Sequence, residues 1–194
     1  MKLLPISIFL ILGFVFNKVS MAQSYNLVTD SSTQITVTGT STLHGWTVTA
    51  KEVQDVPSTL VLSEQNTIDS FAFGVVVSSM DGGRGASMNK KVTTALKATE
   101  HPIITFQQSE PASISAIDAT GNFTLTAKGM LKMVGLEKEI EIEVKGQKTA
   151  NAIVLTGSKP LTFSQFEIEP PSAMFGQIVC GDDIAVNFEF KYEN

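Results

Sequence analysis

The sequence predicts an all-β domain, a sandwich or a barrel, with one short α-helix. Two observations carry this prediction. Short runs with apolar residues at every second position recur along the chain and are separated by glycine, proline or asparagine. A period of two places alternate side chains on opposite faces of a β-strand. In contrast, the segment Met88–Ala98 has its apolar residues at helical spacing.

Residues 1–22 have the pattern of a secretory signal peptide. The segment Leu3–Phe16 is apolar, and Ser20 and Ala22 supply small residues at the spacing that signal peptidase prefers. This apolar run is shorter than the roughly 20 residues of a membrane-spanning helix, which makes a retained anchor the weaker alternative. We therefore expect a periplasmic or secreted protein in which residues 23–194 form one domain.

Charge and cysteine content narrow the possible partners. The chain has 14 basic and 19 acidic residues, a formal net charge of −5, so nothing indicates a nucleic-acid partner. Cys180 is the only cysteine, which excludes an intramolecular disulfide. We interpret it as a small buried or turn residue. A disulfide-linked homodimer or a reactive thiol remains an alternative, and the oligomeric state stays open.

The expected strands follow one another along the chain. They are Tyr25–Val28, Gln34–Gly39, Trp46–Val53, Ser58–Leu62, Ile68–Val77, Ile103–Gln107, the two strands of Asn122–Lys145, Ala152–Gly157 and Ile184–Lys191.

The segment Asn122–Lys145 predicts a long antiparallel hairpin that is apolar on one face and polar on the other. Its turn is expected at Val134–Glu137, where Gly135 can adopt a positive φ. Alternating glutamates occupy the polar face of the second strand. We interpret them as a solvated face, because the sequence offers no second group of donors for a metal site.

The expected helix Met88–Ala98 has Ser87 as a possible N-cap, and Pro102 ends it. The glycine-rich loop Asp81–Gly85 precedes it and holds Arg84, the only arginine in the chain. Glycines and an arginine before a helix can hold an anion at the helix N-terminus. A flexible loop without a ligand is the alternative.

No recognised catalytic motif occurs. The chain contains no P-loop, GxGxxG, GxSxG or HExxH pattern, and its two histidines, His44 and His101, lie in no acid–base motif. We therefore expect no catalytic residue, no bound metal and no cofactor other than a lipid.

Phenylalanine is abundant, with twelve in the chain, many at alternate positions of the expected strands. They either pack a closed core or line a tube, because an antiparallel barrel of about eight strands can just hold a ligand. Composition does not separate these possibilities.

Several segments occur in the order known from the YceI-like family. GMLKMVGLEKEIEIEV resembles its strand–turn–strand unit, and MNKKVTTALKATEHPIITF resembles its helix followed by a proline-led strand. ITVTGTSTLHGWTV resembles its opening hairpin, and LTFSQFEI and DDIAVNFEF lie where the family has its last strands. The resemblance spans Tyr25–Phe190. It implies a lipocalin-like antiparallel β-barrel with one helix, located in the periplasm, that binds isoprenoid chains or similar amphiphiles.

The leading hypothesis is thus a non-enzymatic exported protein that holds a long apolar or amphiphilic ligand, an isoprenoid or a fatty-acid-like lipid, inside the barrel. The expected lining residues are Phe71, Phe73, Val75, Val92, Leu96, Ile104, Phe106, Phe123, Leu125, Leu131, Ile140, Ile142 and Phe188.

Polar contacts to a head group are expected from Arg84, His44 and His101, and the small residues Ala127 and Gly129 would leave room for the tail.

One alternative is a β-rich structural or interaction module of the cell envelope with a packed, ligand-free interior. Another is an enzyme that uses one of the two histidines as a base.

Overall fold

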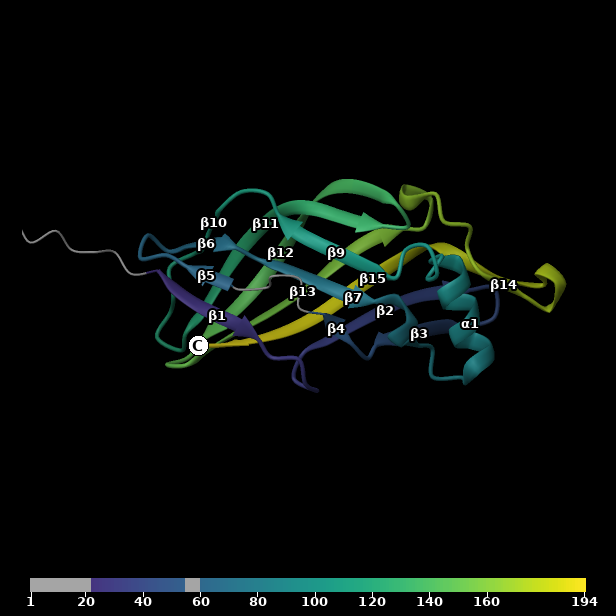
Figure 1. The fold of residues 1–194 in the computed structure, drawn as a ribbon, viewed down its shortest axis with the longest axis horizontal. Helices are drawn as coiled ribbons and strands as arrows, with labels where there is room; N and C mark the ends of the chain where they lie inside the picture. Colours follow the sequence, from purple (N-terminus) through teal and green to yellow (C-terminus); the bar gives the residue numbers. More distant parts are fainter. Residues whose placement is uncertain (1–21, 55–59) are drawn as a thin grey trace, which may run out of the picture.

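The computed structural model describes residues 22–54 and 60–194. The expected signal peptide, apart from Ala22, lies outside the described residues. Among the residues described, no helix combines the length and the apolar character needed to cross a membrane. Figure 1 shows the strands curling around a common interior, with the helix α1 at one end of the elongated molecule.

Fifteen strand segments make up most of the described chain. They are β1 (Gln23–Leu27), β2 (Gln34–Ser41), β3 (Gly45–Ala50), β4 (Val53–Gln54), β5 (Leu60–Leu62), β6 (Thr67–Ser70), β7 (Ala72–Val76), β8 (Met80–Asp81), β9 (Ile103–Gln108), β10 (Ala112–Ser113), β11 (Asn122–Met133), β12 (Leu136–Lys148), β13 (Ala152–Thr162), β14 (Ser172–Ala173) and β15 (Ile178–Glu193). The helical segments are α1 (Ala86–Ala95) and the short 3₁₀ turns η1 (Val77–Ser79), η2 (Ser164–Phe166) and η3 (Met174–Gly176).

The strands form one curled antiparallel sheet. The main path runs β10-β6-β5-β1-β15-β13-β12-β11-β9-β7-β4, while β2 pairs with β15 on the same edge as β1 and is followed by β3 and β8. The long strand β15 organises the sheet, because it pairs with β13 along one edge and with β2 and β1 along the other. The predicted all-β class with one helix is confirmed, and the count of about eight barrel strands stays a prediction.

One wall of the sheet is only partly hydrogen-bonded. The pairing of β12 with β13 runs from the turn between them to Val144 opposite Gly157, and stops there although both strands continue. Leu136–Glu143 of β12 and Ser158–Thr162 of β13 are therefore not joined to each other by a backbone ladder.

The predicted hairpin is confirmed as β11 and β12. Met133 lies opposite Leu136, so the turn consists of Val134 and Gly135, with φ of 52° and 80°. Positive φ at both central residues is the signature of a type I′ turn, whose twist matches that of the strands. The glutamates lie on the outer face, where Glu139 pairs with a lysine of β11 at 3.3 Å.

The helix is displaced relative to the prediction. α1 begins at Ala86 and ends at Ala95, before the expected end at Ala98. Gly85 occupies the N-cap position with a φ of 82° and no side-chain cap, so Ser87 lies inside the helix rather than capping it. Glycine is favoured there because that conformation strains residues with a side chain.

Two expected strands are divided in the structure. The run Trp46–Val53 becomes β3 and β4, and the run Ile68–Val77 becomes β6 and β7 with Phe71 between them. The first part of the expected strand Ser58–Leu62 lies outside the described residues, and β5 begins at Leu60.

The interior divides into a packed half and a hollow half. Phe71 lies at the centre of an aromatic cluster, with its ring centroid 5.8 Å from Phe73, 5.7 Å from Phe106 and 6.0 Å from Phe190. On one side of this cluster the interior is filled by fully buried side chains, namely Tyr25, Leu60, Ile68, Ile153, Leu155 and Tyr192. The aromatic cluster therefore separates a solid core from the remaining interior.

Aromatic rings cover glycines on neighbouring strands. Phe123 lies directly opposite Gly146, where an added Cβ would be 2.1 Å from the Phe123 ring. An added Cβ at Gly129 would be 2.6 Å from the ring of Phe106. The expectation that Ala127 and Gly129 leave room for a tail is therefore wrong for Gly129, because a ring from the adjacent strand already fills that space.

Candidate functional site

The hollow half holds an apolar cavity of about 290 Å³. Its walls come from β2, β3, β7, β8, β9, β11, β12, β13, β14 and β15, and α1 contributes a further side. An engineered protein cavity of about 150 Å³ can hold benzene. This cavity therefore suits an apolar chain of roughly a dozen carbon atoms.

Three phenylalanines form the floor of the cavity. Phe73 stacks on Phe106 with ring centroids 5.5 Å apart and lies 6.4 Å from Phe188. Each of the three side chains is less than 8% exposed, and Phe71 lies behind them. The aromatic cluster therefore limits how deep a ligand can reach.

The polar lining is cationic. Arg84, Lys91 and Lys159 line the cavity together with His44, and no aspartate or glutamate in the described part of the chain does so. Within residues 22–54 and 60–194, none of the three cations forms an ion pair. A concentration of unpaired positive charge in a chain of net charge −5 favours an anionic group at this position.

Arg84 and His44 meet across the mouth. Nη1 of Arg84 donates to Nε2 of His44 over 2.8 Å, because a guanidinium has no acceptor. Nδ1 of His44 lies 2.8 Å from the carbonyl oxygen of Gly45 and so carries the proton. The geometry therefore defines a neutral His44 with both ring nitrogens in use, bridging the loop before α1 and the turn after β2.

The two lysines reach the cavity from opposite sides. Lys91 of α1 donates to the carbonyl oxygen of Ser172 over 2.6 Å and so ties the helix to β14. Lys159 lies on β13 at the same parity as the buried residues Leu155 and Leu161, which places it on the inner face of the sheet. A charged residue on the apolar face of a strand was the sequence signal that could have identified Lys159 as a site residue.

Cys180 also lines the cavity, from the start of β15. Burial raises the pKa of its thiol, while the charge of Lys91 and a contact with Trp46 act in the opposite direction. The half-buried thiol is therefore protonated at neutral pH and is a weak nucleophile.

Most of the lining residues expected from the sequence surround this cavity. Those that line it are Phe73, Val75, Val92, Leu96, Ile104, Phe106, Leu131, Ile140, Ile142 and Phe188. Phe71, Phe123 and Leu125 do not line it. Phe71 and Phe123 lie in the packed half of the interior, and Leu125 lines a separate hollow. A period of two predicts which face of a strand a residue occupies, but not its position along the interior.

The expected head-group residues are divided in a similar way. Arg84 and His44 lie at the mouth, whereas His101 does not line the cavity. The ring of His101 lies against the β11–β12 turn, where a Cβ on Gly135 would be 2.9 Å from Cε1. His101 is therefore a packing residue next to a tight turn.

Other lining residues were not anticipated. They include Ile35, Val37, Trp46, Val48, Leu161, Phe163, Ile184 and Val186, in addition to the lysines and Cys180. Several alternate along expected strands, so their face was predictable. Their proximity to the cavity depends on how β2 and β3 pack against the end of β15, which the pattern of one strand does not contain.

The fold is similar to that of solved proteins. A polyisoprenoid binding domain from Saccharophagus degradans, implicated in plant cell wall breakdown, has 11% identity and a TM-score of 0.66, over 87% of this chain and 97% of that one. For Burkholderia cenocepacia BcnA the identity is 15% and the TM-score 0.60, over 82% and 95%. For the Campylobacter jejuni YCEI protein they are 15% and 0.53, over 100% and 90%.

At these identities the likeness concerns the fold alone. A comparison with curated protein sequences finds no match. The family model of the YceI-like domain matches residues 25–192. This range is nearly the whole of the chain after the expected signal peptide. The chain belongs to the YceI-like family.

Proposed function

We propose that this protein is a non-enzymatic carrier that holds an amphiphile with its apolar tail in the cavity and an anionic head at the mouth. One observation carries the proposal: an apolar cavity whose charged lining residues, among the residues described, are the cations Arg84, Lys91 and Lys159. The cavity also argues against the alternative of a wholly packed interior.

Burial of the tail would supply most of the affinity. Each buried methylene contributes about 0.8 kcal/mol, so ten of them contribute about 8 kcal/mol before the costs of association and ordering. The gain ends where the tail meets the floor at Phe73, Phe106 and Phe188. Affinity is therefore expected to rise with chain length and then to level off.

The head group would be held by charge-assisted hydrogen bonds. Arg84 donates to the neutral ring of His44, and a carboxylate or phosphate oxygen is a stronger acceptor than an imidazole nitrogen. An anionic head would therefore take over donors from Arg84. Lys91 would add charge from the other side of the mouth.

The ligand class is supported by family and shape together. A similar fold is described as a polyisoprenoid binding domain, and an isoprenoid or fatty-acid-like tail suits an apolar cavity of this kind. We propose that β2, β3, β7, β9, β11, β12, β13 and β15 act as an eight-stranded barrel around the tail. The parts of β12 and β13 that do not pair with each other, Leu136–Glu143 and Ser158–Thr162, would let this barrel widen for a branched chain.

The arrangement of the histidines supports a binding role over catalysis. Both ring nitrogens of His44 are engaged, one with Arg84 and one with Gly45. Among residues 22–54 and 60–194, no carboxylate that could act as a partner acid or base lines the cavity. We further propose that the protein works in the periplasm or outside the cell, after cleavage of residues 1–22.

A series of alkyl phosphates and alkanols of increasing chain length, measured by calorimetry, tests the proposal. Affinity for the phosphates should rise to roughly a dozen carbons and then level off, and alkanols should bind more weakly. Val186→Phe should block binding, because Val186 lines the cavity. Asn187→Phe, one position along on the opposite face of β15, is the control and should bind normally.

Lipid extraction after purification from the native compartment provides a second test. Native mass spectrometry should show a bound amphiphile in the wild type and none in Val186→Phe. If wild-type protein carries no lipid and binds none of the alkyl phosphates, the carrier function is wrong.

A further inference from the structure

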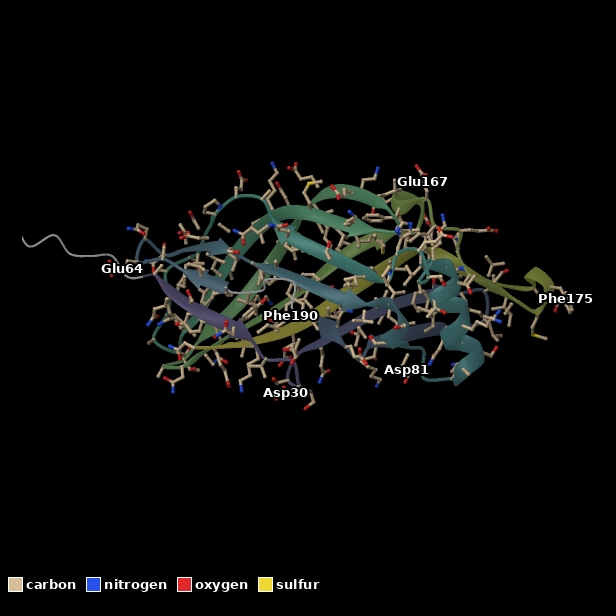
Figure 2. All side chains as sticks on the ribbon, viewed as in Figure 1. Asp30, Glu64, Asp81, Glu167, Phe175 and Phe190 are labelled. Atoms are coloured by element: carbon tan, nitrogen blue, oxygen red, sulfur yellow. The ribbon has the colours of Figure 1, made fainter. Side chains whose placement is uncertain are left out.

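A short hairpin projects beyond the mouth of the cavity and carries large apolar side chains into solvent. It consists of β14, η3 and the beginning of β15, and Phe175 lies at its outermost point (Figures 1 and 2). Phe175 is 110% exposed and Met174 is 63% exposed. An aromatic side chain that packs against none of the residues that the structure describes is unusual in a folded domain.

The backbone holds these side chains outward under strain. Met174 and Phe175 have φ of 50° and 54°, and Gly176 follows with 85°. Bulky residues in the left-handed region cost free energy. This strain is not offset by burial, because both side chains are exposed. A conformation that is costly to the isolated molecule and displays apolar groups points to an external partner.

Further apolar side chains lie beside the hairpin. Leu43, in the turn between β2 and β3, is 67% exposed, and Val179 is 38% exposed. Thr42 accepts from and donates to the backbone of Val179, so the turn and the hairpin are fixed to one another. We call Leu43, Met174, Phe175 and Val179 the apolar tip.

The helix α1, which lies next to the apolar tip, is positively charged. Residues 82–98, which include α1, contain Arg84, Lys90, Lys91 and Lys97 and no acidic residue. Residues 172–179 contain no charged side chain. Lys91 contacts Ser172 directly, and α1 lies beside the hairpin at the same end of the molecule (Figure 1).

We propose that the apolar tip and α1 dock on an anionic lipid bilayer, with the mouth of the cavity facing the membrane. A bilayer offers an apolar layer for Phe175 and Met174 and, just outside it, anionic head groups for the lysines. A second copy of the chain would instead bring a like-charged α1 against α1. The docking gives an amphiphile a route from the membrane into the cavity, and it does not depend on which amphiphile the cavity holds.

Co-sedimentation with vesicles tests the proposal, using phosphatidylcholine alone and phosphatidylcholine with 30% phosphatidylglycerol. The wild type should bind the anionic vesicles, and less so at high salt because the lysines are then screened. Phe175→Ser and Met174→Ser should each lower the partition coefficient about tenfold, the effect of withdrawing one large apolar side chain from the bilayer. Lys90→Glu should weaken binding to the anionic vesicles only.

Ile117→Ser is the matched control. Ile117 is 37% exposed, precedes β11 and does not line the cavity. This variant should bind vesicles as the wild type does. All variants should retain the wild-type melting temperature and, since Phe175 does not line the cavity, wild-type affinity for alkyl phosphates.

The proposal is overturned if wild-type protein does not bind anionic vesicles or if Phe175→Ser binds them unchanged. It is also overturned if light scattering shows a dimer that Phe175→Ser dissociates, because a second copy then occupies the apolar tip. Loss of vesicle binding with intact alkyl phosphate binding would leave the carrier function standing.

Discussion

Nη1 of Arg84 lies 2.8 Å from Nε2 of His44. This hydrogen bond joins two loops that are forty positions apart in the sequence and places the only arginine of the chain at the mouth of the cavity. Its donor is available to a ligand, because the acceptor is a neutral ring that an anion can replace.

Arg84→Ala should weaken the binding of an alkyl phosphate by roughly tenfold or more, since hydrogen bonds to charged groups contribute about 1.5–3 kcal/mol. The affinity for an alkanol of equal length should change little. Calorimetric titration of both ligands measures the difference. Lys90→Ala removes an exposed cation that does not line the cavity and should leave both affinities unchanged. An equal loss for both ligands would mean that Arg84 acts on the cavity and not on the head group.

Phe73→Ala should lengthen the cavity, because the Phe73 ring forms part of the floor and packs against Phe106 and Phe190. Truncation of a buried phenylalanine costs about 3–5 kcal/mol of unfolding free energy, which urea titration measures. The chain length at which affinity levels off should increase by several carbons.

The control for this deeper cavity is Phe190→Ala. Phe190 is fully buried but does not line the cavity. The variant should lose similar stability while keeping the wild-type preference for chain length. If both variants shift the preference, the aromatic cluster is not the floor.

Cys180 should report ligand occupancy without any substitution, because it is the only cysteine and lines the cavity. Its raised pKa predicts slow reaction with iodoacetamide at neutral pH and faster reaction as the pH increases. An alkyl phosphate at about ten times its Kd should slow the reaction about tenfold, because only empty protein reacts. Labelling followed by mass spectrometry measures the rate, and an unchanged rate with saturating ligand would place the tail elsewhere.

Asp118 should make stability pH-dependent in acid. Its carboxylate accepts hydrogen bonds from the Thr120 hydroxyl and from the backbone of Thr120 and Asn122, which lower its pKa from 3.8 to about 2. A lowered pKa in the folded state stabilises the fold above pH 3.8, and this contribution disappears as the pH falls toward 2.

Asp118→Asn should therefore lower the melting temperature at pH 7, and the difference from wild type should shrink between pH 4 and pH 2. Thermal unfolding followed by circular dichroism measures it. Asp183→Asn is the control, because Asp183 is exposed and its side chain forms no hydrogen bond within the described residues. A difference that stays constant over this pH range would assign the effect to something other than the carboxylate charge.

Local pattern predicted the elements of this fold well. Alternation along β11 and β12 predicted the hairpin, its polar outer face and a turn around Gly135, because each of these depends on neighbouring residues in one segment. The ends of α1 were less predictable. Gly85 starts the helix through its backbone conformation, while Ser87, the better N-cap by residue type, lies within it.

The cavity was only partly predictable, and Phe73 and Phe123 show why. Both alternate with polar residues and both face the interior, yet Phe73 borders the cavity while Phe123 packs over Gly146. Periodicity predicts which face of a strand a residue occupies. On which side of the aromatic cluster that residue lies depends on strand register and on the position of α1.

By itself, the sequence determined an all-β chain with one helix, the faces of its strands and its family, because these follow from local spacing and segment order. Only the tertiary structure decided which apolar residues enclose empty space and which fill it. It also brought Arg84, Lys91 and Lys159 to the same cavity and left Phe175 exposed beside its mouth. These features arise from contacts between segments far apart in the chain, and such contacts depend on strand pairing, which no single segment encodes.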